Sequence, residues 1–219
     1  MRIPGSDSLT TAHASVERHA DHDRRLHIAA AAERAFVRYG FHAATMQQVA
    51  EEAQMSAGNL YRYFASKEAL VDGICLLDQR ERSSAFNTLA HSGDVLGMLE
   101  RLLRENLLNK PLHKSVMFLE VAAEAARNPR IAEMMRANDA EVTAGLTHLV
   151  ETAKANGEAV ATLDAGFAAR LMFTYVGGLF RRRALDANFD VEAEAAMTMA
   201  LTRALFAGKI TSSNPAETT

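Results

Sequence analysis

The chain has 219 residues, of which 48% are hydrophobic and 23% charged, proportions that are ordinary for a globular protein. Its formal net charge of −3 argues against a protein that coats nucleic acid with its whole surface, although a local binding face is compatible with that total. The single cysteine, Cys75, excludes an internal disulfide framework and favours a reducing compartment. The sequence begins without a signal peptide and has no apolar run long enough for a membrane span, so we expect a cytoplasmic protein without membrane contact.

The first predicted helix runs from Asp23 to Tyr39, and Gly40 supplies the left-handed residue that ends it. Residues 1–21 are polar, and we expect a flexible arm there. The spacing of the histidines in this region matches no closed metal site. The inner face of the helix combines small and large apolar side chains: Ile28, Ala31, Ala32, Ala35 and Phe36.

Two short helices are predicted next. Thr45 begins one of them with a capping box, in which its hydroxyl accepts the Gln48 N–H and the Gln48 side chain reaches back. Ser56 is the N-cap of the other, whose Leu60 and Phe64 point inward at helical spacing. Two helices joined by a tight turn, the second short and rich in polar and aromatic residues, are typical of the helix-turn-helix motif.

The rest of the chain reads as further helices, which predicts an all-α protein with about nine helices in total. Asp94, Asp164 and Asp190 are the expected N-caps of three of them, and no credible strand is present in the sequence. The predicted spans after the head are 67–90, 94–110, 113–127, 129–156, 164–185 and 191–206.

Many residues of the predicted head stand at fixed spacings. They are Ile28, Ala31, Ala32, Phe36, Gly40, Phe41, Thr45, Val49, Ala50, Ala53, Ser56, Gly58, Leu60, Tyr61, Tyr63, Phe64, Lys67 and Leu70. This pattern resembles the signature of the tetracycline-repressor (TetR) family of transcriptional regulators. One position departs from it, because Gln54 stands in the turn where the family usually has glycine. If Gln54 is left-handed, its side chain costs about 1–2 kcal/mol.

The resemblance implies a division of the chain into four parts. We expect a flexible arm, a three-helix DNA-binding domain with the helix-turn-helix, a larger helical domain for ligand binding and dimerisation, and a disordered tail. Their predicted ranges are 1–21, 22–66, 67–209 and 210–219.

The helix-turn-helix residues suit contacts with DNA. Gln47 and Asn59 carry amides that can pair bidentately with adenine, and Gly58 lets the backbone come close to the DNA. Lys67 stands in the first turn of a helix, where a cation opposes the helix dipole, so we expect a phosphate as its partner. Arg25, close to the predicted start of the first helix, is assigned a phosphate on the same ground. The full predicted set is Arg25, Thr45, Gln47, Ser56, Ala57, Gly58, Asn59, Tyr61, Arg62, Tyr63 and Lys67. For each residue, core packing or plain solvent exposure is the alternative.

By the same resemblance the last two long helices form a dimer interface. Symmetry supports a dimer, because one short recognition helix reads few base pairs and two must lie about 34 Å apart on a pseudo-palindrome. Gly177 and Gly178 each lower the stability of a helix by about 1 kcal/mol relative to alanine. Either a close helix–helix approach or a kink explains why glycine stands at these positions. The predicted interface residues are Phe167, Leu171, Tyr175, Gly178, Met197, Leu201 and Leu205, with an intramolecular core as the alternative.

The middle of the chain is expected to hold the effector. Methionine adapts to irregular shapes and is common on promiscuous binding surfaces, although core packing explains the same residues. The predicted ligand-binding residues are Met98, Leu102, Met117, Phe118, Val121, Met135, Met172, Phe173 and Val176.

The sequence therefore predicts a ligand-responsive transcriptional regulator. We expect a homodimeric repressor that binds a palindromic operator in double-stranded DNA and that a small-molecule effector releases. An activator, or a helical ligand-binding or scaffold protein without an operator, remains as the alternative. The sequence carries no nucleophile elbow, zinc-protease helix, dinucleotide loop or P-loop, so we expect no enzyme activity, no cofactor and no metal.

Overall fold

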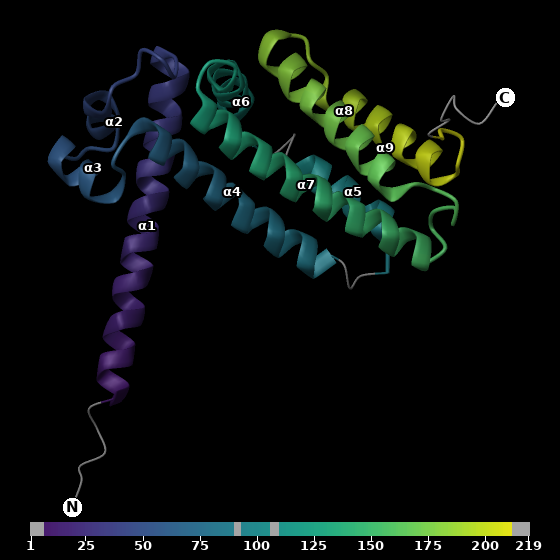
Figure 1. The fold of residues 1–219 in the computed structure, drawn as a ribbon, viewed down its shortest axis with the longest axis horizontal. Coiled ribbons are helices and arrows are strands. Elements are labelled where there is room, and N and C mark those ends of the chain that lie inside the picture. The colour runs from purple at the N-terminus through teal and green to yellow at the C-terminus, as the bar shows by residue number, and fades with distance from the viewer. Residues whose placement is uncertain (1–6, 90–92, 106–109, 212–219) are drawn as a thin grey trace, which may run out of the picture. The chain divides into compact units, whose positions relative to one another are not determined.

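The computed structural model describes residues 7–89, 93–105 and 110–211 of the chain. Within these ranges the regular elements are nine α-helices, without a β-strand (Figure 1). The predicted all-α class is therefore confirmed. In chain order the helices are α1 (Asp7–Tyr39), α2 (Met46–Glu52), α3 (Ala57–Tyr63), α4 (Lys67–Leu89), α5 (Val95–Leu103), α6 (Leu112–Ala125), α7 (Pro129–Ala155), α8 (Ala165–Leu185) and α9 (Val191–Phe206).

The first helix is longer than predicted. α1 already begins at Asp7, so the prediction of a flexible arm is wrong for residues 7–21, while residues 1–6 lie outside the described part. Polar composition alone does not end a helix, and the sequence has neither glycine nor proline between Gly5 and Gly40 to interrupt it. As a consequence, Arg25 lies in the interior of α1 and not near its start.

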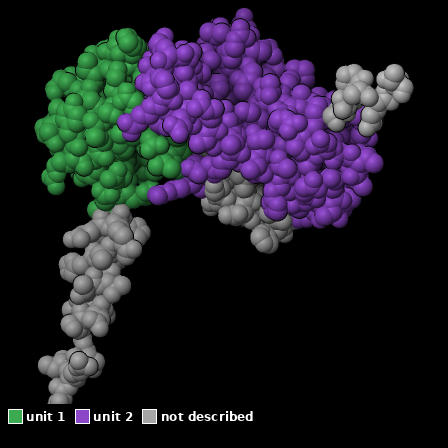
Figure 2. All heavy atoms as spheres, in the orientation of Figure 1, with its two compact units in different colours: residues 1–77 green, residues 78–219 purple. Residues whose placement is uncertain are grey.

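The chain divides into two compact units, residues 1–77 and 78–219 (Figure 2). The division falls inside α4, later than the predicted boundary after residue 66. Leu70, Val71 and Ile74 explain the difference, because these residues in the first turns of α4 are buried and belong to the first unit. We call residues 1–77 the head.

The core of the head is built on α1. All the predicted inner residues of this helix are fully buried, and Phe36 packs edge-on against Phe41 with ring centroids 5.0 Å apart. Val49, Ala50 and Leu60 from the two short helices are likewise inaccessible to solvent. The head therefore has an apolar core shared by all of its helices.

The core of the second unit is one cluster of apolar side chains from α5, α7, α8 and α9. Ile210 packs against this cluster, so the predicted disordered tail does not begin at residue 210, while residues 212–219 are outside the described ranges. α6 packs against α7 and α8, and the Asp78 carboxylate in α4 pairs with Lys110 and Lys114 at 3.2 and 3.6 Å. None of the helices in the described ranges is long and apolar enough to cross a membrane.

Candidate nucleic-acid interface

Both short helices of the head begin with the predicted caps. The backbone N–H of Gln48 donates to the Thr45 hydroxyl at 3.2 Å, and the Thr45 N–H donates to the Gln48 side-chain oxygen at 2.8 Å. This is a complete capping box. The Ser56 hydroxyl accepts from the Asn59 N–H at 3.2 Å and starts α3 in the same way. Local sequence therefore determines where each of these helices begins.

The turn between α2 and α3 is a Schellman motif with glutamine in the left-handed position. Gln54 has φ = 54°, its N–H donates to Glu51 O at 3.0 Å, and the Met55 N–H donates to Ala50 O at 2.9 Å. The ends of α7 and α9 use the same motif with Gly157 and Gly208, at φ = 77° and 69°. The prediction that Gln54 is the irregular residue of the turn is confirmed.

α3 presents one apolar and one polar face. Leu60 is fully buried and Phe64 is 5% exposed, as predicted, whereas Tyr61 is 53% exposed. Arg62 and Gly58 are also exposed, and a Cβ added at Gly58 would meet no atom within 4 Å. Packing inside the chain therefore does not require a glycine at position 58.

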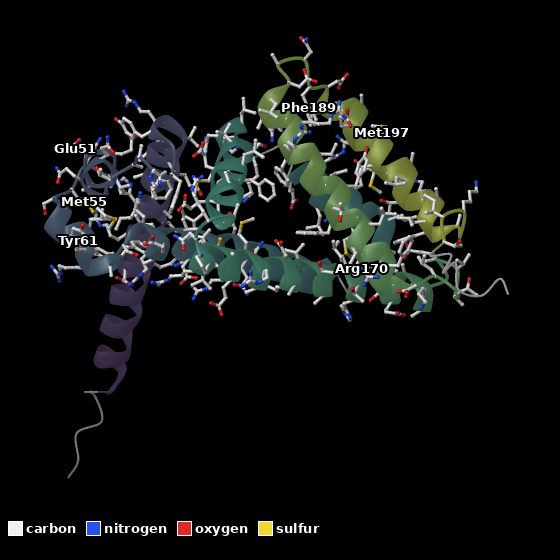
Figure 3. The ribbon with its side chains drawn as sticks, turned by 45° about the horizontal axis from the view of Figure 1, so that its top comes forward. Glu51, Met55, Tyr61, Arg170, Phe189 and Met197 are labelled. Atoms are coloured by element: carbon white, nitrogen blue, oxygen red, sulfur yellow. The ribbon has the colours of Figure 1, made fainter. Side chains whose placement is uncertain are left out.

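The other predicted DNA-facing residues line the same helices. Thr45, Gln47 and Ser56 are exposed, and Ala57, Asn59 and Tyr63 are half-buried. The Gln47 amide donates to the Glu51 carboxylate at 2.9 Å. Figure 3 shows Glu51, Met55 and Tyr61 along one edge of the head.

Arg25 lies among groups of the head itself. Its Nε pairs with Asp21 at 3.0 Å, its Nη1 donates to Tyr63 O at 3.3 Å, and its guanidinium lies 5.4 Å from the centre of the Phe64 ring. The ground for giving it a phosphate was a position close to the start of the helix, and that ground is wrong because α1 begins at Asp7.

Lys67 has partners in the loop that follows α1. Its ammonium donates to Phe41 O and His42 O, both at 2.8 Å, and lies 5.0 Å from the centre of the Phe41 ring. The prediction that Lys67 contacts a phosphate stays a prediction, because these two backbone acceptors are neutral and leave the charge of the ammonium and its third donor in place.

Two residues of α1 that contact the helix-turn-helix were not identified from the sequence. His27 Nε2 lies 2.9 Å from Ala53 O, and Arg34 pairs with Glu52 at 2.7 Å. The two residues stand seven positions apart, which places them on one face of a helix, and this spacing is the signal that identifies them.

The predicted ligand-binding residues fall into two groups within the second unit. Met98, Leu102 and Met172 belong to its main apolar cluster, and Val176 packs against that cluster. The predicted residues of α6, by contrast, lie outside the cluster. The ring centroids of Phe118 on α6 and Phe180 on α8 are 5.8 Å apart. Met117 and Val121 are buried, while Phe118, Met135 and Phe173 are half-buried.

The predicted dimer residues are exposed to different degrees. Met197 is 49% exposed and Gly178 is exposed. Leu205 is fully buried in the core of its own chain, so its prediction as an interface side chain is wrong. Helical periodicity identifies an apolar face but does not tell which element covers it. Phe167, Leu171, Tyr175 and Leu201 are half-buried.

Comparison with known proteins matches both units to families. Residues 28–74 match the family described as bacterial regulatory proteins, tetR family. Residues 96–207 match the C-terminal domain of the BetI-type transcriptional repressors.

Individual regulators are similar over most of their length. The HTH-type transcriptional regulator UidR of Escherichia coli K12 is 28% identical over 190 residues, which cover 86% of this chain and 94% of that protein. TtgR of Pseudomonas putida is 28% identical over 173 residues, covering 73% and 80%. The structure of Salmonella enterica GusR superposes with a TM-score of 0.71 at 28% identity, covering 84% of this chain and 95% of that one. The chain therefore belongs to the tetR family of bacterial regulatory proteins, and it is a ligand-responsive transcriptional regulator.

Proposed function

We propose that the chain is a cytoplasmic homodimeric repressor that holds a palindromic operator through α3 and leaves it when a small molecule binds the second unit. The observation that carries this proposal is the polar face of α3. Gly58, Tyr61 and Arg62 are exposed on this helix, whereas Leu60 is buried in the core of the head. A helix with this composition can enter the major groove while the rest of the head supports it.

Within the groove, the amides of Gln47 and Asn59 are the candidates for reading adenine. The exposed hydroxyl of Tyr61 can donate to a phosphate oxygen, and the start of α2 at Thr45 presents backbone N–H groups to the same anions. Contacts of this kind set the register on the duplex, whereas the amides supply the sequence preference.

The operator is tested by selecting fragments of the source genome that the wild-type protein retains. On such a fragment, Asn59→Ala is expected to reduce the discrimination against a changed base by about 1–3 kcal/mol. Tyr61→Phe is expected to weaken binding without changing the base preference. Glu151→Ala, at an exposed position on α7, is the control. Failure to select any fragment, or unchanged binding by both variants, contradicts the proposal.

The dimer is proposed on the outer faces of α8 and α9. α8 continues unbroken through Gly177 and Gly178, and a Cβ at either position would meet no atom of the chain within 4 Å. These glycines therefore serve no packing purpose inside one chain, which favours close approach of a second copy. Met197 supplies an exposed apolar side chain on α9.

The effector is proposed to bind between α6 and the main cluster of the second unit. Met117 on α6 and Met172 on α8 are both buried, and methionine side chains adapt to irregular shapes. The effector releases DNA only if it binds one conformation of the dimer better than the other, since equal affinity for both shifts nothing. α4 contributes residues to both units and is the covalent route between them.

A further inference from the structure

α2 leaves its last carbonyl groups to be satisfied from outside the helix. It has only seven residues, so the carbonyls without an intrahelical partner are more than half of its total. The Schellman motif at its end satisfies two of them, and the N–H of the C-cap residue Ala53 satisfies a third. The acceptors are Val49 O, Ala50 O and Glu51 O, which bind the N–H groups of Ala53, Met55 and Gln54 respectively.

The next two carbonyls are bound by side chains of α1. His27 Nε2 lies 2.9 Å from Ala53 O, and Arg34 Nη2 donates to Glu52 O at 3.5 Å. Arg34 Nε also pairs with the Glu52 carboxylate at 2.7 Å, which fixes the direction of the guanidinium. A donor at the end of a helix also interacts favourably with its dipole, the more so when it is charged. Two α1 side chains thereby complete the end of α2.

The end of α3 is bound from α1 as well. Arg25 Nη1 donates to Tyr63 O at 3.3 Å, and Asp21 holds the Arg25 Nε at 3.0 Å. The guanidinium also lies 5.8 Å from the centre of the Tyr63 ring and 5.4 Å from that of Phe64. Arg25, His27 and Arg34 therefore contact the C-terminal ends of both helices of the helix-turn-helix.

We infer that Arg25, His27 and Arg34 are positioning residues, which set the angle of α2 and α3 for DNA without touching the DNA themselves. Helices of two turns have little stability of their own and take their orientation from tertiary contacts. Three polar contacts on carbonyl ends restrict rotation of these helices more than apolar packing does, because hydrogen bonds are directional. This inference depends on the proposed function, since it assumes that α3 reads an operator.

Salt dependence separates a positioning role from a phosphate contact. The plot of log K against log salt has a negative slope, whose magnitude we call the salt slope. The salt slope falls by about 0.9 for each phosphate contact removed, or about 1.8 for a dimer with two heads. We expect Arg25→Gln to weaken operator binding about threefold to tenfold for each head, through loss of one hydrogen bond, while the salt slope stays at the wild-type value. Arg62→Gln, at an exposed position on α3, is the matched control and should lower the salt slope. The probe is the selected genomic fragment, and anisotropy is measured between about 50 and 200 mM salt.

His27 provides a rescue experiment. His27→Ala is expected to weaken binding about threefold to tenfold for each head, and His27→Gln, whose amide can donate from a similar place, is expected to restore it. All binding is measured well below the melting midpoint of each variant, so that the folded fraction is complete.

Three outcomes would overturn the inference: a lower salt slope for Arg25→Gln, wild-type affinity of folded His27→Ala, or a His27→Gln variant as weak as His27→Ala. They differ from failure of the proposed function, in which the wild-type protein selects no fragment or Asn59→Ala leaves base preference intact.

Discussion

The Glu158 carboxylate binds the backbone N–H of Val95, which lies 3.0 Å from each of its two oxygens, and so caps a helix from which it is separated by 63 residues. One of these oxygens also accepts from the Leu96 N–H at 3.1 Å. Asp94 binds the Gly97 N–H at 2.8 Å, so two carboxylates together satisfy the first turn of α5.

Removal of this distant cap should destabilise the second unit. Glu158→Ala leaves two N–H groups of α5 without an acceptor, and we expect the free energy of unfolding to fall by about 1–2 kcal/mol. Urea unfolding followed by circular dichroism measures the change. Glu151→Ala, which removes an exposed carboxylate paired with Lys154, is the control and should cost less than about 0.5 kcal/mol. Equal stability of the two variants would contradict the capping role.

Glycine at position 54 should stabilise the head. Gln54 pays the steric cost of a left-handed conformation that Gly157 and Gly208 adopt freely in the same motif. We expect Gln54→Gly to raise the free energy of unfolding by about 1 kcal/mol, somewhat less than the strain itself because glycine loses more entropy on folding. Thermal melting of the variant tests this. A melting point below that of the wild type would show that the Gln54 side chain compensates its strain.

Alanine at two glycines of the head should have opposite effects. A Cβ at Gly73 would overlap the ring of Phe64, which is 5% exposed, so Gly73→Ala should force the ring to shift and destabilise the head by about 1–3 kcal/mol. Gly58→Ala enters open space in α3 and should not lower stability, but it should weaken operator binding if the backbone approaches the DNA. Melting curves and gel shifts on both variants make the comparison. Wild-type affinity of Gly58→Ala would place α3 further from the DNA.

Bulk at Gly178 should act on the dimer and not on the single chain. The position is exposed and a Cβ there meets nothing within 4 Å, so Gly178→Leu leaves the fold of one chain intact. It should weaken self-association, which sedimentation equilibrium measures, because two α8 helices can no longer approach closely. Ala140→Leu, at an exposed position on α7, should dimerise as the wild type does. If Gly178→Leu also dimerises as the wild type does, the interface lies elsewhere.

Asp139 should make stability depend on pH. Burial raises the pKa of Asp139 above its ordinary value of 3.8, and a hydrogen bond from Asn138 opposes this with a smaller effect. A raised pKa in the folded state favours folding at low pH, and this contribution is lost as pH rises through the raised pKa. Asp139→Asn should therefore be more stable than the wild type at pH 7, and the difference should disappear below pH 3.8. Urea midpoints measured across this range test the sign, with the exposed Glu133→Gln as the control.

Several features of this protein follow from the sequence alone. The caps of Thr45, Ser56 and Asp164 each bind an N–H within three residues, and Gly157 stops a helix through contacts in its own last turn. Interactions of this range depend only on neighbouring residues, so the helix-turn-helix, the all-α class and the family pattern could be predicted from the chain.

Other features depend on which segments meet in the folded protein. Lys67 binds carbonyls 25 and 26 residues away, and Arg25 binds one 38 residues away, so neither partner could be identified from the adjacent sequence. Leu205 likewise shows its burial only when the other helices of its core are in place. Local sequence determined where the recognition helix begins and what its surface carries, whereas tertiary packing decided which charges hold it in position. The physical reason is that a charged side chain binds whichever carbonyl the folded chain brings within hydrogen-bond distance, regardless of how far apart the two residues are in the sequence.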